Sequence, residues 1–176
     1  MSRRHTIRVI AGLLCIPVAL FAAVYGAGFR INWTPSYPLG LWRILPLNRP
    51  VHLGDRIFIC PPDTETFREA RTRGYLRRGL CPGWLSPLIK TVVVLPGQRV
   101  ENGQFVVIDG RTLPHSELQP LDGSGRALTP AAGGFVPPGM VFLHSPYRGS
   151  YDSRYFGPVP VAGVLGLAEP VLTVEP

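Results

Sequence analysis

Lysine is almost absent from this sequence of 176 residues. Of its 18 lysines and arginines, Lys90 is the one lysine, which leaves 17 arginines. The guanidinium of arginine stays charged in proteins, whereas the ammonium of lysine can release its proton. Lys90 is therefore the one basic side chain of these two types that can become neutral. Lys90 begins an apolar, β-branched run at residues 91–95, and burial lowers the pKa of an ammonium. We expect Lys90 to be buried, largely neutral at pH 7 and able to act as a base. The alternative is a half-exposed lysine at a strand edge.

Cysteine is also scarce, with three residues in the chain. Cys15 lies in an apolar segment and is most simply a small apolar side chain. Cys60 and Cys81 remain as a pair, and we expect them to form a disulfide if they reach an oxidising compartment. A zinc site needs more ligands at closer spacing, so neither a metal nor another cofactor is expected.

Acidic residues are few, since 11 Asp and Glu stand against 18 Lys and Arg and leave a net charge of +7. Such an excess suits nucleic acid, an anionic membrane surface or simply a basic exterior. No charged residue lies between Arg8 and Arg30, and the 21 residues 9–29 are enough to cross a bilayer as a helix. The sequence therefore predicts a transmembrane helix at residues 9–29.

The arginines that precede this segment predict its orientation. By the positive-inside rule, residues 1–8 stay in the cytoplasm and residues 30–176 form a domain on the other side. A cleavable signal peptide is the alternative, although the apolar run is longer than the core of a usual signal peptide. Either topology puts the domain outside the cytoplasm, where the lipid bilayer is a better partner than nucleic acid.

Glycine and proline are frequent, with 20 residues of each. This content favours short strands joined by turns, so we expect a mainly β domain. Asp109-Gly110 is typical of a type I′ hairpin turn, and residues 114–138 are expected to form an irregular excursion. Residues 61–80, closed by the predicted disulfide, form a helical insertion. Strands are predicted at residues 41–45, 56–60, 91–95, 105–108, 111–113, 140–144 and 159–167, and a helix at 64–78.

Ser36 is the serine that the sequence restrains most. Pro35 and Pro38 exclude a helix or a central strand there, so Ser36 lies on a restrained loop just after the apolar segment. A serine hydroxyl is a poor nucleophile unless a positioned base takes its proton, and a neutral lysine is such a base. The sequence therefore predicts that Ser36 pairs with Lys90.

Residues 35–41 (PSYPLGL), 89–97 (IKTVVVLPG) and 150–157 (SYDSRYFG) form three motifs. Together they resemble the nucleophile box, the lysine box and the late Ser-x-Asp-Ser-Arg box of the type I signal peptidases, a membrane-anchored family with a Ser/Lys dyad. Residues 60–82 are similar to the conjugative-transfer branch of that family. Residues 145–148 (SPYR) depart from the usual Gly-Asp-Asn-Arg, which favours a specialised substrate over general preprotein cleavage.

The resemblance implies a signal-peptidase-like fold and a role for each matched residue. Ser36 would attack the scissile carbonyl, and Lys90 would accept its proton and later return it. Thr34 could offer its hydroxyl to the oxyanion beside the Ser36 backbone N–H, because Pro35 has no N–H to give.

The late box supplies three further residues by the same resemblance. Ser150 would orient the Lys90 amine by a hydrogen bond. Asp152 and Arg154 would hold this loop as an ion pair. Asp152 is also implicated in activity in the conjugative-transfer branch, so we place it with the catalytic residues and Arg154 with the supporting ones.

The resemblance further implies a peptidase of the bacterial inner membrane whose domain lies in the periplasm. Its expected substrate is a pilin-like membrane protein of a conjugative transfer machinery, cleaved near its C-terminal end. The acyl-enzyme would be resolved by water, or by the amine of the substrate's own N-terminus to give a cyclic product.

Two other functions compete with this one. A Ser-His-Asp hydrolase would draw its base from His52, His115 or His144; the contact from His144 to the adjacent Ser145 would be poor, because neighbours in a strand point to opposite faces. An anchored, non-catalytic β domain that serves as a scaffold is the second alternative. A scaffold leaves the single lysine and the proline-braced serine unexplained.

Overall fold

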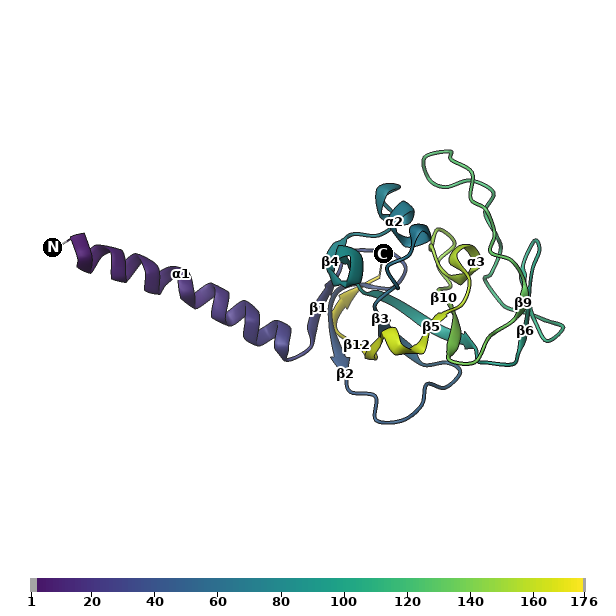
Figure 1. Cartoon of the computed structure of the whole chain (residues 1–176), viewed down its shortest axis with the longest axis horizontal. Coiled ribbons are helices and arrows are strands. Elements are labelled where there is room, and N and C mark those ends of the chain that lie inside the picture. Colours follow the sequence, from purple (N-terminus) through teal and green to yellow (C-terminus); the bar gives the residue numbers. More distant parts are fainter. Residues whose placement is uncertain (1–2, 176) are drawn as a thin grey trace.

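Two antiparallel sheets form the body of the protein, and helix α1 projects from it (Figure 1). The computed structural model describes the backbone of residues 3–175 and the side chains of residues 15–175. The helices are α1 (Arg3–Gly26), α2 (Glu65–Thr72) and α3 (Ser153–Phe156), with 3-10 turns η1 (Pro82–Trp84) and η2 (Val161–Gly163). The strands are β1 (Phe29–Asn32), β2 (Leu39–Leu45), β3 (Arg56–Ile59), β4 (Arg78–Cys81), β5 (Leu88–Val94), β6 (Arg99–Asn102), β7 (Val106–Ile108), β8 (Arg111–Thr112), β9 (Gly134–Phe135), β10 (Met140–His144), β11 (Val159–Pro160) and β12 (Val164–Val174).

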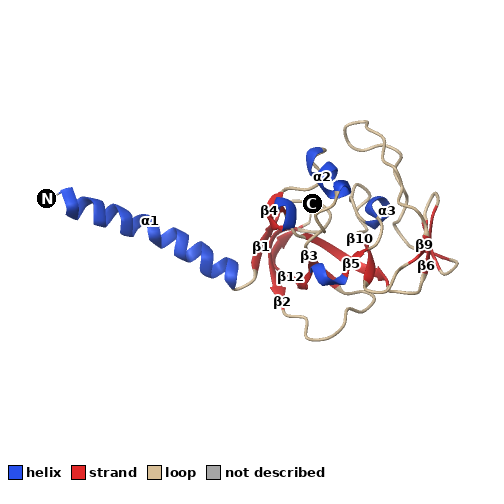
Figure 2. Cartoon of the chain, viewed as in Figure 1, coloured by secondary structure: helices blue, strands red, loops and turns tan. Residues whose placement is uncertain are grey.

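The larger sheet carries the strands that position the candidate site. Its order is β1-β2-β12-β3-β5-β10-β11, and the smaller sheet has the order β8-β7-β6-β9. Strand β5 lies between β3 and β10, with Ile57 opposite Lys90 and His144 opposite Thr91. The prediction of a mainly β domain is confirmed, and Figure 2 shows how few of the domain's residues are helical.

Strand β12 is the third strand of this sheet, between β2 and β3, although it is the last strand along the chain. It pairs with β2 on one side and with β3 on the other. Gly166 permits this close approach, because a Cβ at that position would collide with the Leu45 carbonyl. The predicted strand at residues 159–167 is thus two elements, β11 and the longer β12.

The predicted membrane helix over residues 9–29 needs correction. Helix α1 ends at Gly26, and the chain turns at Gly28, whose φ of 90° suits glycine. The Gly28 carbonyl then accepts a hydrogen bond from the Ile44 N–H, so that Phe29 already begins β1. Within the part of the chain that the structure describes, no helix is long and apolar enough to cross a membrane. The predicted transmembrane helix is therefore not supported.

The Cys60–Cys81 disulfide is present and closes the segment at residues 61–80. Within that segment the helix is shorter than predicted, because it ends at Thr72 and Gly74 follows with a φ of 84°. The i,i+4 ion pair between Glu69 and Arg73 forms at 2.6 Å. The insertion packs onto the main core through Phe67, one of its buried residues.

The predicted hairpin in the smaller sheet is also confirmed. Strands β7 and β8 pair antiparallel around Asp109 and Gly110. Both turn residues have positive φ, at 48° and 81°, as a type I′ turn requires. The excursion at residues 114–138 is largely irregular, with the short strand β9 near its end.

Candidate active site

Ser36 lies on a loop that connects β1 to β2 and is held by the side chain of Asn32. The Asn32 amide nitrogen donates to the backbone carbonyls of Thr34, Tyr37 and Pro38 at 2.9 to 3.0 Å. Its oxygen accepts from the Thr34 N–H at 3.0 Å. Pro35 and Pro38 have no N–H, so the backbone of this loop cannot form the hydrogen bonds of a regular strand. The buried side-chain amide of Asn32 supplies hydrogen bonds to the loop in their place.

Lys90 lies in the middle of β5, with 3% of its side chain exposed. Burial lowers the pKa of its ammonium to about 8, and the nearby Asp152 carboxylate opposes this shift. The sequence predicted a largely neutral amine at pH 7, which is wrong, because a pKa of about 8 leaves roughly one-tenth of it neutral. The prediction of burial is confirmed.

The hydroxyl of Ser150 joins these two residues. Its oxygen accepts one hydrogen bond from Lys90 Nζ at 2.7 Å and another from Ser36 Oγ at 3.3 Å. The side chains of Ser36 and Lys90 share no direct hydrogen bond among those found over residues 15–175. The structure thus brings the predicted pair together through Ser150 and not by direct contact.

Asp152 and Arg154 form a fully buried ion pair beneath this loop. Arg154 donates twice to the Asp152 carboxylate, from Nε at 2.8 Å and from Nη2 at 3.0 Å, and both side chains are 0% exposed. Arg154 Nη2 also donates to the Ser150 carbonyl at 3.0 Å. Among the hydrogen bonds found over residues 15–175, Asp152 makes none to Lys90 or Ser36, and its carboxylate binds Arg154 and the Ser145 N–H. Its assignment to the catalytic residues stays a prediction.

Ser145 was considered in the sequence only as the neighbour of His144, yet it connects the loop of Ser36 to the ion pair. Its hydroxyl donates to the Ser36 carbonyl at 2.6 Å, and its N–H donates to Asp152 Oδ2 at 3.1 Å. The only signal in the sequence was its position where residues 145–148 depart from the usual motif. Asn32 was missed in the same way, although asparagine beside a proline-rich loop often stabilises turns.

The hydroxyl of Thr34, predicted to be an oxyanion donor, has a hydrogen-bond partner at the end of β1. It donates to Asn32 Oδ1 at 2.8 Å. A threonine hydroxyl carries one proton, so this proton is unavailable to an oxyanion in the arrangement observed. The Ser36 backbone N–H is the remaining oxyanion donor of the two that the sequence suggested.

The histidines do not form a Ser-His-Asp arrangement with Ser36. The ring of His144 is buried, which lowers its pKa, and its Nε2 lies 3.2 Å from the His115 carbonyl. His144 also precedes Ser145, whose hydroxyl is directed to the Ser36 carbonyl. The observed contacts therefore leave Lys90 as the base nearest to Ser36 along a hydrogen-bonded path.

Ser36 and Lys90 open onto a groove of about 850 Å³. One wall is formed by the C-terminal end of α1, by β1 and by the loop that carries Ser36. The other wall is formed by the disulfide-closed insertion and the start of β5. Apolar side chains line much of it, among them Ile31, Trp33, Phe58, Leu76, Leu80 and Ile89. The groove has room for an extended peptide next to the nucleophile.

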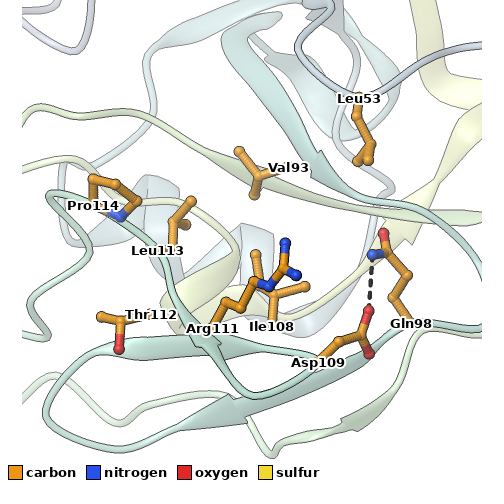
Figure 3. A pocket seen from close by; sticks show the side chains of 9 residues that line it. All are labelled: Leu53, Val93, Gln98, Ile108, Asp109, Arg111, Thr112, Leu113 and Pro114. Carbon is orange, nitrogen blue, oxygen red and sulfur yellow. Dashed lines mark hydrogen bonds between the residues drawn. The ribbon is translucent and has the colours of Figure 1, made fainter.

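A second hollow, of about 440 Å³, lies away from these residues (Figure 3). Figure 3 shows its lining, where Gln98 donates to Asp109 at 2.9 Å. None of its lining residues is a serine or a lysine. It offers none of the chemistry of the first groove.

The pKa of Lys90 gives a prediction for the pH dependence. If the neutral amine is the base, kcat/KM for peptide cleavage will rise about tenfold per pH unit and level off above pH 8. The sign follows from burial, which lowers the pKa and makes the base form available at a lower pH than in an exposed lysine. The His144→Gln protein serves as the control, and its kcat/KM should rise with pH over the same range. If the rise of kcat/KM shifts to another pH in the His144→Gln protein, the histidine and not Lys90 is the base.

The comparisons with known proteins cover nearly the whole chain. Residues 3–173 match the family model described as signal peptidase, peptidase S26. "Conjugal transfer protein TraF" of Agrobacterium tumefaciens (strain 15955) is 56% identical over 176 residues, which cover 100% of both chains. "Plasmid transfer protein TraF" of Escherichia coli is 36% identical over 159 residues and 88% of each chain. A solved signal peptidase I from Enterococcus faecalis V583 covers 68% of this chain and 97% of its own, at 23% identity and a TM-score of 0.40. The family expected from the three motifs is confirmed.

Proposed function

Because the chain belongs to the signal peptidase family S26, we propose that it is a serine endopeptidase of conjugative transfer, with Ser36 as nucleophile and Lys90 as general base. The observation that carries this proposal is the hydrogen-bonded path from Ser36 through Ser150 to the buried amine of Lys90. A buried amine with a lowered pKa is the kind of base that a serine nucleophile needs.

Proton transfer in this arrangement would use the Ser150 hydroxyl. When Lys90 is neutral, its lone pair can accept the Ser150 proton, while Ser150 Oγ accepts the proton of Ser36. Ser36 Oγ then attacks the scissile carbonyl, and its backbone N–H stabilises the oxyanion that forms. Lys90 returns the proton to the leaving amine as the acyl-enzyme ester forms on Ser36.

The second half of the reaction resolves this ester. Water can attack the ester carbonyl and give a linear product with a free carboxylate. The N-terminal amine of the substrate can attack instead, which forms a peptide bond and a cyclic product. In both cases the nucleophile loses one proton to the base, and Ser36 regains its hydroxyl proton.

We propose a pilin-like subunit as the substrate, because the named relatives are conjugal or plasmid transfer proteins. The disulfide supports a location outside the cytoplasm, where such bonds persist. A periplasmic domain is therefore part of this proposal, and so are its contacts with the lipid bilayer and the transfer machinery.

The test is the intact mass of the pilin subunit of the same conjugative system, from cells with and without this protein. We expect the subunit to lose a C-terminal segment when the protein is present. A product lighter by one water than the cleaved linear form would establish cyclisation, and the linear mass would establish hydrolysis. A scaffold function predicts the same pilin mass in both strains, and that result would overturn the proposal.

A further inference from the structure

The groove beside Ser36 carries positive charge on both walls. Arg30 lies on the β1 wall, and Arg77 and Arg78 lie on the wall formed by the insertion. Lys90 adds the buried amine at its base. Of the residues that line the groove, none is an aspartate or a glutamate. A peptide in this groove therefore meets cationic groups that no lining carboxylate balances.

Ion pairs hold most of the other arginines whose side chains the structure describes, but none of these three. In the part of the chain whose side chains are described, Arg77 and Arg78 make neither an ion pair nor a side-chain hydrogen bond, and both are exposed. Arg30 donates from Nη1 to the carbonyls of Tyr25 and Phe29, but its buried Nε has no partner. By contrast, seven other arginines form ion pairs: Arg49, Arg68, Arg73, Arg99, Arg126, Arg148 and Arg154.

The insertion holds its two arginines in a fixed place relative to the catalytic strand. The Ser86 N–H donates to the Arg77 carbonyl at 2.9 Å, and Arg78 forms a β-bridge with Leu85. Leu85 and Ser86 lead directly into β5, which carries Lys90. The disulfide at Cys81 ends β4 and ties this wall to the main sheet at Cys60. The backbone of Arg77 and Arg78 is therefore held in the groove wall and is not part of a free loop.

We propose that Arg77 and Arg78 bind a carboxylate of the substrate peptide beside the scissile bond. This inference rests on the proposed peptidase function and adds the chemistry by which its substrate is selected. The carboxylate is either the side chain of an acidic residue or the terminal carboxylate of a short leaving segment. Guanidinium groups suit both, because they bind carboxylates with paired, charge-assisted hydrogen bonds.

Binding to the inactive Ser36→Ala protein tests the proposal without requiring catalysis. The probes are alanine- and valine-rich dodecapeptides labelled with an uncharged fluorophore. In the first set, each peptide has an amidated C-terminus and one glutamate, and the position of the glutamate differs from peptide to peptide. Each has a neutral match, which is the same peptide with glutamine in place of the glutamate. A second, fully neutral peptide is compared with a free and with an amidated C-terminus. The dissociation constants are measured by fluorescence anisotropy at low and at high salt.

We expect at least one carboxylate peptide to bind about tenfold more tightly than its neutral match, with an advantage that shrinks as salt rises. The Arg77→Gln/Arg78→Gln double variant should lose this advantage. The Arg99→Gln/Arg111→Gln variant changes the net charge equally outside the groove and should keep it. A preference for glutamate at one position identifies an acidic residue, and a preference for the free C-terminus identifies a leaving segment.

Equal binding of charged and neutral peptides would overturn the proposal, as would an advantage that survives in the Arg77→Gln/Arg78→Gln protein. Cleavage of the same peptides by the unsubstituted protein is measured separately. If charge-dependent binding occurs without any cleavage, the recognition of a carboxylate stands and the peptidase assignment fails. If neutral peptides are cleaved as well as acidic ones, the peptidase assignment stands and the carboxylate site fails.

Discussion

Replacement of Lys90 by arginine is expected to lower the rate of substrate cleavage roughly 10⁴-fold or more, because nucleophile and base act as one unit. Arginine keeps the positive charge but does not release its proton in a protein, so it cannot accept one from Ser36 or Ser150. Single-turnover cleavage of the pilin subunit measures the effect. A circular dichroism spectrum like that of the wild type shows that the variant has folded.

The Lys90→Met protein is the matched control, because it removes both the charge and the base. It should be as inactive as Lys90→Arg. Its stability provides a second measurement, since the unfolded chain holds the lysine proton up to a pH near 10.5 and the folded protein only up to about 8. The buried charge therefore costs stability below pH 8. The wild type should gain about 3 kcal/mol relative to Lys90→Met between pH 8 and 10.5. Retained cleavage by either variant would remove Lys90 from the mechanism.

Removal of the Asp152 carboxylate is expected to produce the largest loss of stability. Arg154 is fully buried, and in an Asp152→Ala protein its charge would keep only carbonyl partners. An unpaired buried charge of this kind costs about 3–5 kcal/mol. The loop that carries Ser150 would lose its anchor at the same time. We expect cleavage to fall about 10²-fold even where the protein remains folded. Urea unfolding and cleavage below the transition measure the two effects.

An exposed ion pair on the smaller sheet provides the control for this prediction. Arg99 and Glu101 lie 3.2 Å apart, but their side chains are 60% and 57% exposed. Water screens such a pair, so Glu101→Ala should destabilise the protein several times less than Asp152→Ala. Replacing Asp152 and Arg154 together by apolar residues should recover part of the stability but not the activity. Equal losses for Glu101→Ala and Asp152→Ala would show that burial of the ion pair is unimportant.

The sequence identified the central residues of the site because their chemistry is unusual locally. A single lysine next to a β-branched run and a serine between prolines stand out without any knowledge of the fold. The strands, the type I′ hairpin and the disulfide followed from similarly local patterns. The resemblance to a known family added Ser150 and the ion pair of the late motif.

The arrangement of those residues could not be predicted, because it depends on contacts between distant parts of the chain. Ser36 and Ser150 are 114 residues apart, and Lys90 and Ser150 are 60 apart. No local pattern shows that the Ser150 hydroxyl lies between the nucleophile and the base. Likewise, Asn32 and Ser145 bind backbone carbonyls, and no local pattern in the sequence distinguishes them from other polar residues. The opposing effect of Asp152 on the pKa of Lys90 also required the three-dimensional structure.

The position of β12 between β2 and β3 has a consequence for how the domain folds. Residues 164–174 pair with β2, whose residues lie more than 100 positions earlier, so the sheet cannot close around β3 and β5 before β12 is available. Pairing at such long range has a high entropic cost of loop closure and is slow compared with local pairing. During synthesis, residues 29–163 therefore remain without the strand that joins β2 to β3. Ser36 on the β1–β2 loop and Lys90 on β5 lie on opposite sides of β12 in the sheet order, so their separation depends on the pairing of this last strand.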